Sequence, residues 1–595
     1  ETYANKPPTG EAKLRKLPLC ALLSTSRGNT YVQGSFMSVT RLSMVSLRAF
    51  LLLLFYGAGN INCSTVNHGN STDMLALLDF KRATSDPTGA LRSWNRSVHY
   101  CNWTGVICSS VNPGRVFALK LPGKSLSGEI TPSLGNLTFL RILNLSYNGF
   151  AGHLPPLNLN QLRELILLDL SSNSFQGTIP DSLTNCSNLK LLNLSSNGFS
   201  GQLPPLNLYQ LCELVSLDLS SNSFQGRILD SITNCSNIMV MDLSRNMLQG
   251  PIPTKIGSLY NLIAMDLSKN NLTGVIPPSI SNATHLQILI LRENELGGSI
   301  PDMFGKLSDM IGFTVGANSL SGRIPPSVFN LTSLQTLGLY ANKLQGELLH
   351  DIGDTLPEII FFSLGDNMLQ GHIPASLGNT SGLELIDLSS NSFVGEIPTF
   401  GKLPNLEYLN LGHNMLESSE RQRWESLYGL TNCSNLHVLT LDNNQLQGAI
   451  PDLVGRLSTQ LEHLHLSGNN LSGIVPLSLG NLSSIIDLNL SNNSLTGRIE
   501  GWLGSLRNVQ SIDLHGNNFV GPIPPSFGNL SALFKLDLSY NNLQGFIPPI
   551  LGKLSQLEKL DLSYNNLQGF IPPAISELKQ LNGLYLSSNR LSGKI

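Results

Sequence analysis

Charged side chains are scarce in this chain of 595 residues, at 13%, and the formal net charge is −3. Within the repeats, the longest cationic cluster is the short run from Arg421 to Arg423. Nucleic-acid binding proteins usually carry a broad basic patch, so a solvated loop is the simpler interpretation of this cluster. We therefore expect no nucleic-acid partner.

The sequence also lacks the motifs of common enzyme classes. It has no Gly-rich loop, H-R-D or D-F-G of a kinase, and no H-E-x-x-H, Walker loop or hydrolase elbow. Aspartate recurs at one fixed phase of a repeat, which is typical of a structural or surface feature rather than of an acid/base pair. The chain is predicted to be no enzyme and to need no cofactor.

Long apolar runs are missing as well. The run inside Met44–Asn60 is about ten residues long, too short for a membrane-spanning helix. Arg48 before it and Gly57–Gly59 after it are typical of a secretory signal peptide, which we place at 37–59, with cleavage after Gly59 or near Cys63. Residues 1–36 lack both an initial Met and any repeat, and are interpreted as an upstream extension of the gene model.

Cysteine is sparse, with eight residues in the chain. Cys186, Cys235 and Cys433 each occur within T-N-C-S-N at the same phase, far apart in sequence. A metal site needs clustered ligands, and these cysteines are not clustered. We therefore predict that their thiols, and that of Cys212, are buried between repeats. No metal site is expected.

One pattern, L-x-x-L-x-L-x-x-N-x-L-x-G-x-I-P, fills most of the chain at a period of about 24 residues. Clean copies are Leu262–Pro277 and Leu533–Pro548. Alternating leucines predict a short strand with one apolar face, and Gly and Pro exclude a regular helix from the end of each copy. A repeat of this length and pattern indicates a leucine-rich repeat solenoid.

The Asn is the polar position that we expect to be least replaceable, because its amide can satisfy backbone groups inside the stack. The first copy departs, with Lys124 in its place, as expected of a terminal repeat. The Asn recurs at Asn148, Asn173, Asn197, Asn222, Asn246, Asn270, Asn294, Asn318, Asn342, Asn367, Asn391, Asn414, Asn444, Asn469, Asn493, Asn517, Asn541, Asn565 and Asn589.

The L-x-G-x-I-P ending resembles the plant-specific subclass of leucine-rich repeats, found in receptor kinases, receptor-like proteins and inhibitors of cell-wall enzymes. The predicted fold is an α/β-type solenoid, a superhelix of about twenty repeats over 116–595 with parallel strands on its concave face. Residues 60–115 resemble the N-terminal helical cap of such receptors, through D-x-x-A-L-L-x-F-K from Asp73 and C-x-W-x-G-V-x-C from Cys101. This resemblance implies a Cys101–Cys108 disulfide.

About nineteen N-x-S/T sequons fit a secreted glycoprotein. Asn144, Asn193 and Asn489 lie within predicted concave strands, where a glycan would obstruct a ligand, so they are either unmodified or mark stretches not used for binding. The leading glycosylation candidates are Asn95, Asn102, Asn136, Asn282, Asn330, Asn481 and Asn529.

Most predicted strands fill their solvent-facing positions with D-L-S or N-L-S, but most of those between about Leu286 and Gly468 depart from this default. Aromatic, charged and His residues are the kinds that recognition surfaces use. We expect a peptide or extended glycan to bind along this stretch of about 34 Å, although drift at exposed positions could also produce it. The candidate ligand-binding residues are Arg292, Glu293, Tyr340, Phe361, Tyr408, His413, His437, Asp442, His463 and His465, with Thr314 and Asp366 at the same positions.

Four of these residues are histidines: 413, 437, 463 and 465. They could make binding sensitive to mildly acidic pH, or they could simply be solvated.

One repeat is interrupted by Glu417–Thr431. Leu416, Glu417, Trp424 and the segment Leu430–Leu436 resemble the corresponding repeat of the immune subgroup of plant receptor kinases, which includes sensors of flagellin and elongation factor. That family implies a co-receptor kinase as a partner of the full-length protein.

The resemblance implies extracellular ligand recognition in defence, as the ectodomain of a receptor-like kinase at the plasma membrane. The kinase and membrane helix would lie beyond Ile595, where the last repeat breaks off. The alternatives are a secreted inhibitor of a cell-wall-degrading enzyme, a receptor-like protein without a kinase, and a truncated copy without function. If the chain truly ends at Ile595, the product would be secreted.

Overall fold

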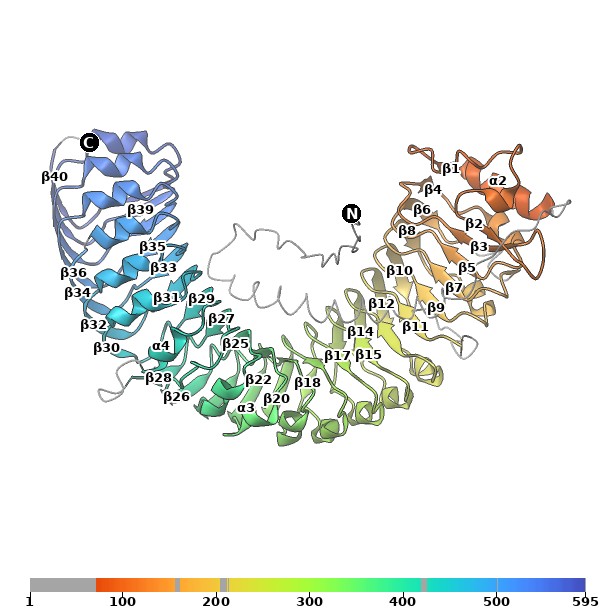
Figure 1. Ribbon diagram of the computed structural model, residues 1–595, viewed down its shortest axis with the longest axis horizontal. Helices are drawn as coiled ribbons and strands as arrows, with labels where there is room; N and C mark the ends of the chain where they lie inside the picture. Colours follow the sequence, from red (N-terminus) through yellow and green to blue (C-terminus); the bar gives the residue numbers. More distant parts are fainter. Residues whose placement is uncertain are drawn as a thin grey trace, which may run out of the picture.

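The computed structural model describes residues 71–155, 161–203, 211, 213–418, 425–499 and 501–593. The expected signal peptide, the 1–36 extension, Cys63, Cys212 and Trp424 lie outside these residues. The described chain curves into an open arc, with one line of strands along its inner side and helical turns along its outer side (Figure 1). This arrangement confirms the predicted solenoid.

The inner line is one long parallel sheet in which each strand pairs with the strand of the next coil, from β3 to β41. The register stays in step along the arc, so that each coil places equivalent residues side by side. The strands are β3 (Val116–Lys120), β5 (Ile142–Asn144), β7 (Leu167–Asp169), β9 (Leu191–Asn193), β11 (Ser216–Asp218), β13 (Val240–Asp242), β15 (Ala264–Asp266), β17 (Ile288–Ile290), β19 (Gly312–Thr314), β21 (Thr336–Gly338), β23 (Phe361–Ser363), β25 (Leu385–Asp387), β27 (Tyr408–Asn410), β29 (Val438–Thr440), β31 (His463–His465), β33 (Asp487–Asn489), β35 (Ser511–Asp513), β37 (Lys535–Asp537), β39 (Lys559–Asp561) and β41 (Gly583–Tyr585).

The repeated Asn holds neighbouring coils together, as the sequence predicts. The Nδ2 atom of Asn270 donates to the carbonyls of Leu243, Leu267 and Ser268 at 3.0, 3.1 and 3.3 Å, and its Oδ1 accepts from the Leu248 N–H at 3.0 Å. One side chain thereby satisfies backbone groups of its own coil and of the coil before it, which would otherwise be orphaned inside the stack.

A second line of strands, which the sequence analysis did not anticipate, follows the Asn in each coil. Gly in the L-x-G-x-I-P segment adopts positive φ there, for example 81° at Gly322, which a side chain would disfavour. The strands are β4 (Ser127–Gly128), β6 (Gly149–His153), β8 (Ser174–Gly177), β10 (Gly198–Gln202), β12 (Ser223–Arg227), β14 (Met247–Pro251), β16 (Asn271–Thr273), β18 (Gly297–Gly298), β20 (Ser319–Arg323), β22 (Lys343–Glu347), β24 (Met368–His372), β26 (Ser392–Glu396), β28 (Met415–Glu417), β30 (Gln447–Ala449), β32 (Asn470–Ile474), β34 (Ser494–Arg498), β36 (Asn518–Gly521), β38 (Asn542–Gly545), β40 (Asn566–Gly569) and β42 (Arg590–Leu591).

Short helical turns form the outer side of the arc. Several contain a Gly that allows neighbouring turns to approach closely, since a Cβ on Gly257 would lie 1.7 Å from the Ser279 carbonyl oxygen of the next coil. The 3₁₀ turns are η2 (Pro132–Asn136), η4 (Asp181–Asn185), η6 (Asp230–Asn234), η7 (Ile256–Ser258), η8 (Pro278–Asn282), η9 (Asp302–Lys306), η10 (Pro326–Asn330), η11 (Ala375–Asn379), η12 (Asp452–Arg456), η13 (Leu477–Asn481), η14 (Gly501–Ser505), η15 (Pro525–Asn529), η16 (Pro549–Lys553) and η17 (Pro573–Glu577), and the α-helical turns are α3 (Ile352–Thr355) and α4 (Glu425–Leu430).

The N-terminal cap covers the first coil with helix α2 (Ser71–Ala83), strands β1 (Thr84–Ser85) and β2 (Val106–Cys108), and turn η1 (Tyr100–Asn102). Phe80 of α2 is fully buried, and its ring lies 5.7 Å from that of Phe150 in the solenoid. Burial of these rings closes the apolar end of the stack.

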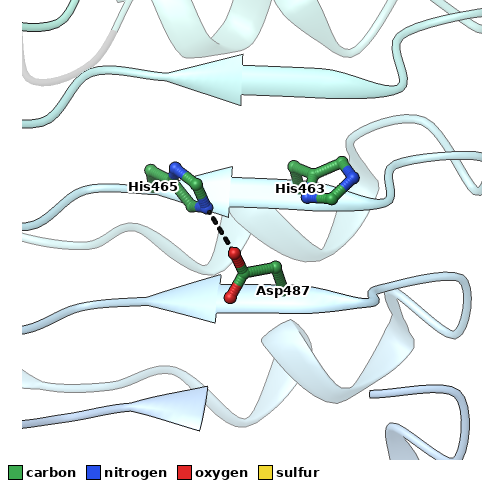
Figure 2. A group of neighbouring side chains, drawn as sticks. All are labelled: His463, His465 and Asp487. Atoms are coloured by element: carbon green, nitrogen blue, oxygen red, sulfur yellow. Dashed lines mark hydrogen bonds and ion pairs between the residues drawn. The ribbon is translucent and has the colours of Figure 1, made fainter. Parts of the chain in front are cut away.

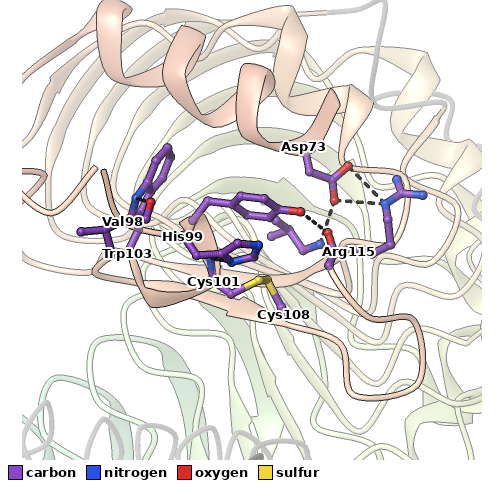
Figure 3. Close-up of a disulfide and its surroundings, with 10 residues drawn as sticks. Asp73, Val98, His99, Cys101, Trp103, Cys108 and Arg115 are labelled. Carbon is purple, nitrogen blue, oxygen red and sulfur yellow. Dashed lines mark hydrogen bonds and ion pairs between the residues drawn. A yellow bond between two sulfur atoms is a disulfide. The ribbon is translucent and has the colours of Figure 1, made fainter. Parts of the chain in front are cut away.

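Two further contacts fix the cap, and Figure 3 shows both. The buried Asp73 carboxylate accepts from the Val116 backbone N–H at 2.8 Å and pairs with Arg115 Nε at 3.1 Å. Cys101 and Cys108 form a disulfide, which confirms the predicted pairing.

A continuous apolar core runs through all the coils. Its leucines come from the middle of each strand, and Phe150, Phe175, Phe199 and Phe224 stack from coil to coil with centroids 6.1 to 6.5 Å apart. The thiols of Cys186, Cys235 and Cys433 are buried in the same core, as predicted.

Candidate ligand-binding surface

The inner sheet presents two rows of side chains on the concave side of the arc. Successive strand residues alternate between faces, so the residues on either side of the core leucine point away from the core. We call the residue before the core leucine the first concave row and the residue after it the second concave row. Phe361, Tyr408 and His463 belong to the first row, and His465 belongs to the second.

The default D-L-S and N-L-S strands use their polar groups for local structure. Asp169 Oδ1 accepts from the Ser171 backbone N–H at 3.1 Å and from its hydroxyl at 2.7 Å. Asn193 makes the same pair of contacts with Ser195, at 3.1 and 2.7 Å. These side chains therefore stiffen the turn after each strand and leave little capacity to discriminate a partner.

Strands β17 to β23 lack this hydrogen bonding between a strand residue and the turn that follows it. Their second-row residues are Ile290, Thr314, Gly338 and Ser363, so no carboxylate or amide turns back onto the chain there. The candidate residues begin in these coils.

Arg292, Glu293 and Tyr340 lie just after their strands rather than within them. Glu293 adopts a φ of 56°. Its carboxylate forms ion pairs with Arg292 and with Lys269, whose Nζ lies 2.8 Å away. The Tyr340 ring occupies space that Gly316 of the preceding coil leaves open, since a Cβ on Gly316 would lie 2.5 Å from the ring. The turn after the strand is thus also part of the candidate surface.

Phe361 and Tyr408 come together in one apolar cluster with Leu385 and Val438. All four occupy the first concave row of the successive strands β23, β25, β27 and β29, so the cluster is continuous along the arc. It is separate from the core beneath the sheet, and its four members are only 2% to 9% exposed.

His413 and Asp442 form the next group. His413 lies in the turn after β27 at φ 55°, and its Nε2 is 3.2 Å from Asp442 Oδ2. His437 directly precedes β29, and its Nδ1 atom is buried.

His463 and His465 lie two residues apart on β31, and Asp487 lies opposite His463 on β33 (Figure 2). The His465 Nε2–H donates to Asp487 Oδ2 across 3.1 Å. The His465 and Asp487 side chains are partly buried, at 28% and 23% exposed.

The two histidines differ in their pKa. Burial lowers the pKa of His463 to about 4, so this ring stays neutral in mildly acidic solution. Burial also disfavours the charged form of His465, but the hydrogen bond to Asp487 and the carboxylates of Asp487, Asp442 and Asp513 outweigh it and raise its pKa. Burial would raise the pKa of Asp487, but its hydrogen bond to His465 and the charge of His465, together with the contributions of Ser511 and His463, outweigh burial and lower it.

The candidate residues therefore follow one another from β17 to β31 as a band along the concave side, rather than meeting in one pocket. At the usual strand spacing of about 4.8 Å, that band is about 34 Å long. The insertion residue Trp424 lies outside the described residues. The glycosylation candidates Asn136, Asn282, Asn330, Asn481 and Asn529 are all exposed at the ends of outer turns, and Asn95 and Asn102 are exposed on the cap.

Exposed aromatic residues that were not among the predicted site residues lie in the C-terminal coils. Tyr540 and Tyr564 stack with centroids 4.0 Å apart, and Phe546 and Phe570 are 63% and 64% exposed. They belong to two identical copies of Y-N-N-L-Q-G-F-I-P-P in neighbouring coils, from which no binding surface was predicted.

The chain matches known family models over much of its length. Residues 70–109 match the leucine rich repeat N-terminal domain, and 459–519 and 548–591 match a leucine rich repeat model. Single Leucine Rich Repeat matches cover 164–186, 188–208, 213–235, 261–283, 285–307, 435–457 and 532–554. Within the described residues, no helix has the length and apolar character needed to cross a membrane.

Curated relatives from plants match over short stretches. The chain is 49% identical over 88 residues to the LRR receptor-like serine/threonine-protein kinase EFR of Arabidopsis thaliana, which is 14% of this chain and 8% of that protein. It is 41% identical over 83 residues to the receptor kinase-like protein Xa21 of Oryza sativa subsp. japonica, which again is 14% of this chain and 8% of that protein. The matched stretch is thus less than a tenth of the length of either relative.

Solved structures match over most of the arc. The Arabidopsis receptor kinase HAESA, in complex with the peptide hormone IDA and the co-receptor SERK1, superimposes with a TM-score of 0.73 at 31% identity. The match covers 88% of this chain and 95% of that one. The plant peptide hormone receptor RGFR1, in complex with RGF2, gives a TM-score of 0.73 at 32% identity over 80% and 75% of the two chains.

Proposed function

Because this chain belongs to the leucine-rich repeat ectodomains of plant receptor kinases, we propose that it recognises an extracellular ligand and that the ligand is an extended peptide. The band from β17 to β31 is the proposed binding surface. Its side chains include charged residues, an apolar cluster and histidines, whereas the default strands use their polar groups internally. This contrast along a single sheet is the observation that carries the proposal.

A peptide suits this surface better than a compact ligand. The band is long and narrow, and a fully extended peptide of about ten residues would span its length. The first-row cluster of Phe361, Leu385, Tyr408 and Val438 runs along the same band, although each of its members is 9% exposed or less in this structure. The peptide complexes of HAESA and RGFR1 support this choice over a glycan.

We further propose that the chain is the sensing part of an immune-type receptor-like kinase at the cell surface. The support is the resemblance of Leu416–Leu436 to immune receptors and the local identity to EFR and Xa21. The kinase activity and the signalling in defence would belong to the whole receptor. A co-receptor kinase is the proposed protein partner, by analogy with SERK1 in the HAESA complex.

The test begins with a random linear peptide library displayed on phage and panned against the glycosylated ectodomain, without any assumed ligand. Selected peptides are then measured by biolayer interferometry against the triple variant Tyr340→Ala/Tyr408→Ala/His465→Ala. The expected result is at least a tenfold loss of affinity, because aromatic anchors contribute most to such interfaces.

A matched control carries alanine at the same three kinds of position in one default coil: Ser216→Ala, Asp218→Ala and Ser220→Ala. It should retain the affinity of the unaltered protein. Failure to select any peptide, or equal losses in both triple variants, would contradict the proposal.

A further inference from the structure

Two histidines and one carboxylate converge at the C-terminal end of the candidate band. His463 and His465 are separated by one residue on β31, so both side chains leave the same face of the sheet. Asp487 is the register partner of His463 on the next strand. One ligand atom from each of the three residues lies within 4.8 Å of the others.

These distances suit a metal ion after small side-chain rotations. Zn²⁺ binds His nitrogen and carboxylate oxygen at about 2.0–2.2 Å, which places two ligands of a tetrahedral ion about 3.3 Å apart. His465 Nε2 and Asp487 Oδ2 are already 3.1 Å apart. Figure 2 shows His463 beside the His465–Asp487 pair, and a rotation of the His463 ring is the movement we infer to close the remaining gap of at most 4.8 Å.

The charges around the three residues also favour a cation. Besides Asp487, two further carboxylates act on His465: Asp442, in the turn after β29, and Asp513, on β35. Lys535, on β37, is itself paired with Asp513, with its Nζ 3.1 Å from Oδ2. Asp442 in turn lies 3.2 Å from His413.

We propose that His463, His465 and Asp487 form a binding site for a divalent transition-metal ion, for which Zn²⁺ is the best match. Three protein ligands leave at least one coordination position open to water or to a carboxylate of a bound molecule. Without metal, the His465–Asp487 hydrogen bond holds two of the three ligands in place. The site stands independently of the proposed peptide recognition.

The neighbouring His413–Asp442 pair supplies a matched comparison. Its atoms lie 3.2 Å apart, close to the His465–Asp487 distance, but no third His, Cys, Asp or Glu among the described residues completes a cluster there. A His–Asp pair alone should bind metal far more weakly than three ligands.

The experiment titrates ZnCl₂ into the tag-free ectodomain in a non-chelating buffer and follows binding by isothermal titration calorimetry. A second titration with Co²⁺ reports tetrahedral coordination through its visible absorption. We expect one equivalent to bind, with His463→Ala and Asp487→Asn each weakening the affinity at least tenfold and His413→Ala leaving it unchanged.

His463→Ala is the decisive variant, because it keeps the His465–Asp487 bond and therefore the local fold. Its thermal unfolding without metal should match that of the unaltered protein, while its metal affinity falls. No stoichiometric binding by the unaltered protein, or unchanged affinity in this variant, would overturn the proposal. Both readouts are made without peptide, so they do not depend on the proposed function.

Discussion

A single asparagine in each coil satisfies more backbone groups than any other side chain in the repeat. Asn541 shows the pattern, because its Nδ2 donates to the carbonyls of Leu514, Leu538 and Ser539 at 3.0, 3.2 and 3.1 Å. Its Oδ1 accepts from the Phe519 N–H at 3.0 Å. These hydrogen bonds explain why asparagine recurs at the same position of each repeat.

Replacing Asn541 with alanine should lower the free energy of unfolding by about 2–4 kcal/mol, because buried donors and acceptors lose their partners. Urea unfolding followed by circular dichroism measures the change. The adjacent Asn542 is exposed and serves as the control, since Asn542→Ala should change stability by less than about 0.5 kcal/mol. Equal effects of the two substitutions would show that the hydrogen bonds of the repeated asparagine do not hold the coils together.

The buried thiols should be chemically inert in the folded protein. Burial raises the pKa of Cys186 to about 12 and that of Cys433 to about 11, so almost no reactive thiolate exists at pH 8. Iodoacetamide at that pH should leave both sites unmodified in native protein and label both in 8 M urea, as mapped by peptide mass spectrometry. Rapid labelling of either site in the native protein would show that the thiol is not buried.

At the scale of elements, the sequence predicts the inner strands and the cap well, because alternating leucines and the cap motif report local packing directly. The second line of strands was missed, since L-x-G-x-I-P has no alternating pattern and its pairing depends on the neighbouring coil. The cluster of His463, His465 and Asp487 was missed for the same reason: only the register of β31 and β33 brings Asp487 to the histidines.

The cap contains an element whose stability should depend on pH. The Asp86 carboxylate accepts from the backbone N–H groups of Ala90 and Leu91, both at 2.8 Å. Burial alone would raise its pKa, but these backbone bonds, with those to Gly89 and Thr88, outweigh burial and lower it. The folded pKa lies below the unfolded one, so the stabilisation is present above the unfolded pKa and is lost as pH falls through the folded pKa.

Asp86→Ala should therefore lower the melting temperature at pH 6 and have a smaller effect near pH 3. Differential scanning fluorimetry at both pH values measures this difference. Asp79→Ala, at an exposed position on α2, is the control and should leave the melting temperature unchanged. A pH-independent effect of Asp86→Ala would contradict the assigned role of the charged carboxylate.

At the scale of the whole molecule, sequons recur at the end of the outer turn in alternate coils. They occur at Asn136, Asn185, Asn234, Asn282, Asn330, Asn379, Asn432, Asn481 and Asn529, all of them exposed. Glycans there would cover the outer side of the arc every two coils, about 10 Å apart. The concave band would remain open for a ligand.

Intact glycopeptide mass spectrometry of protein secreted from plant cells should find glycans on these outer asparagines. Occupancy should be much lower at Asn144, Asn193 and Asn489, the last residues of their concave strands, because their Oδ1 atoms accept from Ser146, Ser195 and Ser491 in the turns that follow. High occupancy at the strand positions would instead place sugar on the concave side and restrict where a ligand can bind.

The most direct test of concave recognition is photo-crosslinking with a library-selected peptide that carries one benzophenone side chain. After irradiation and digestion, mass spectrometry identifies the crosslinked segments of the ectodomain. We expect adducts confined to segments between Leu286 and Gly468, with loss of crosslinking when unlabelled peptide is in excess. Competable adducts on the outer turns, or on inner strands outside that interval, would contradict the proposed binding surface.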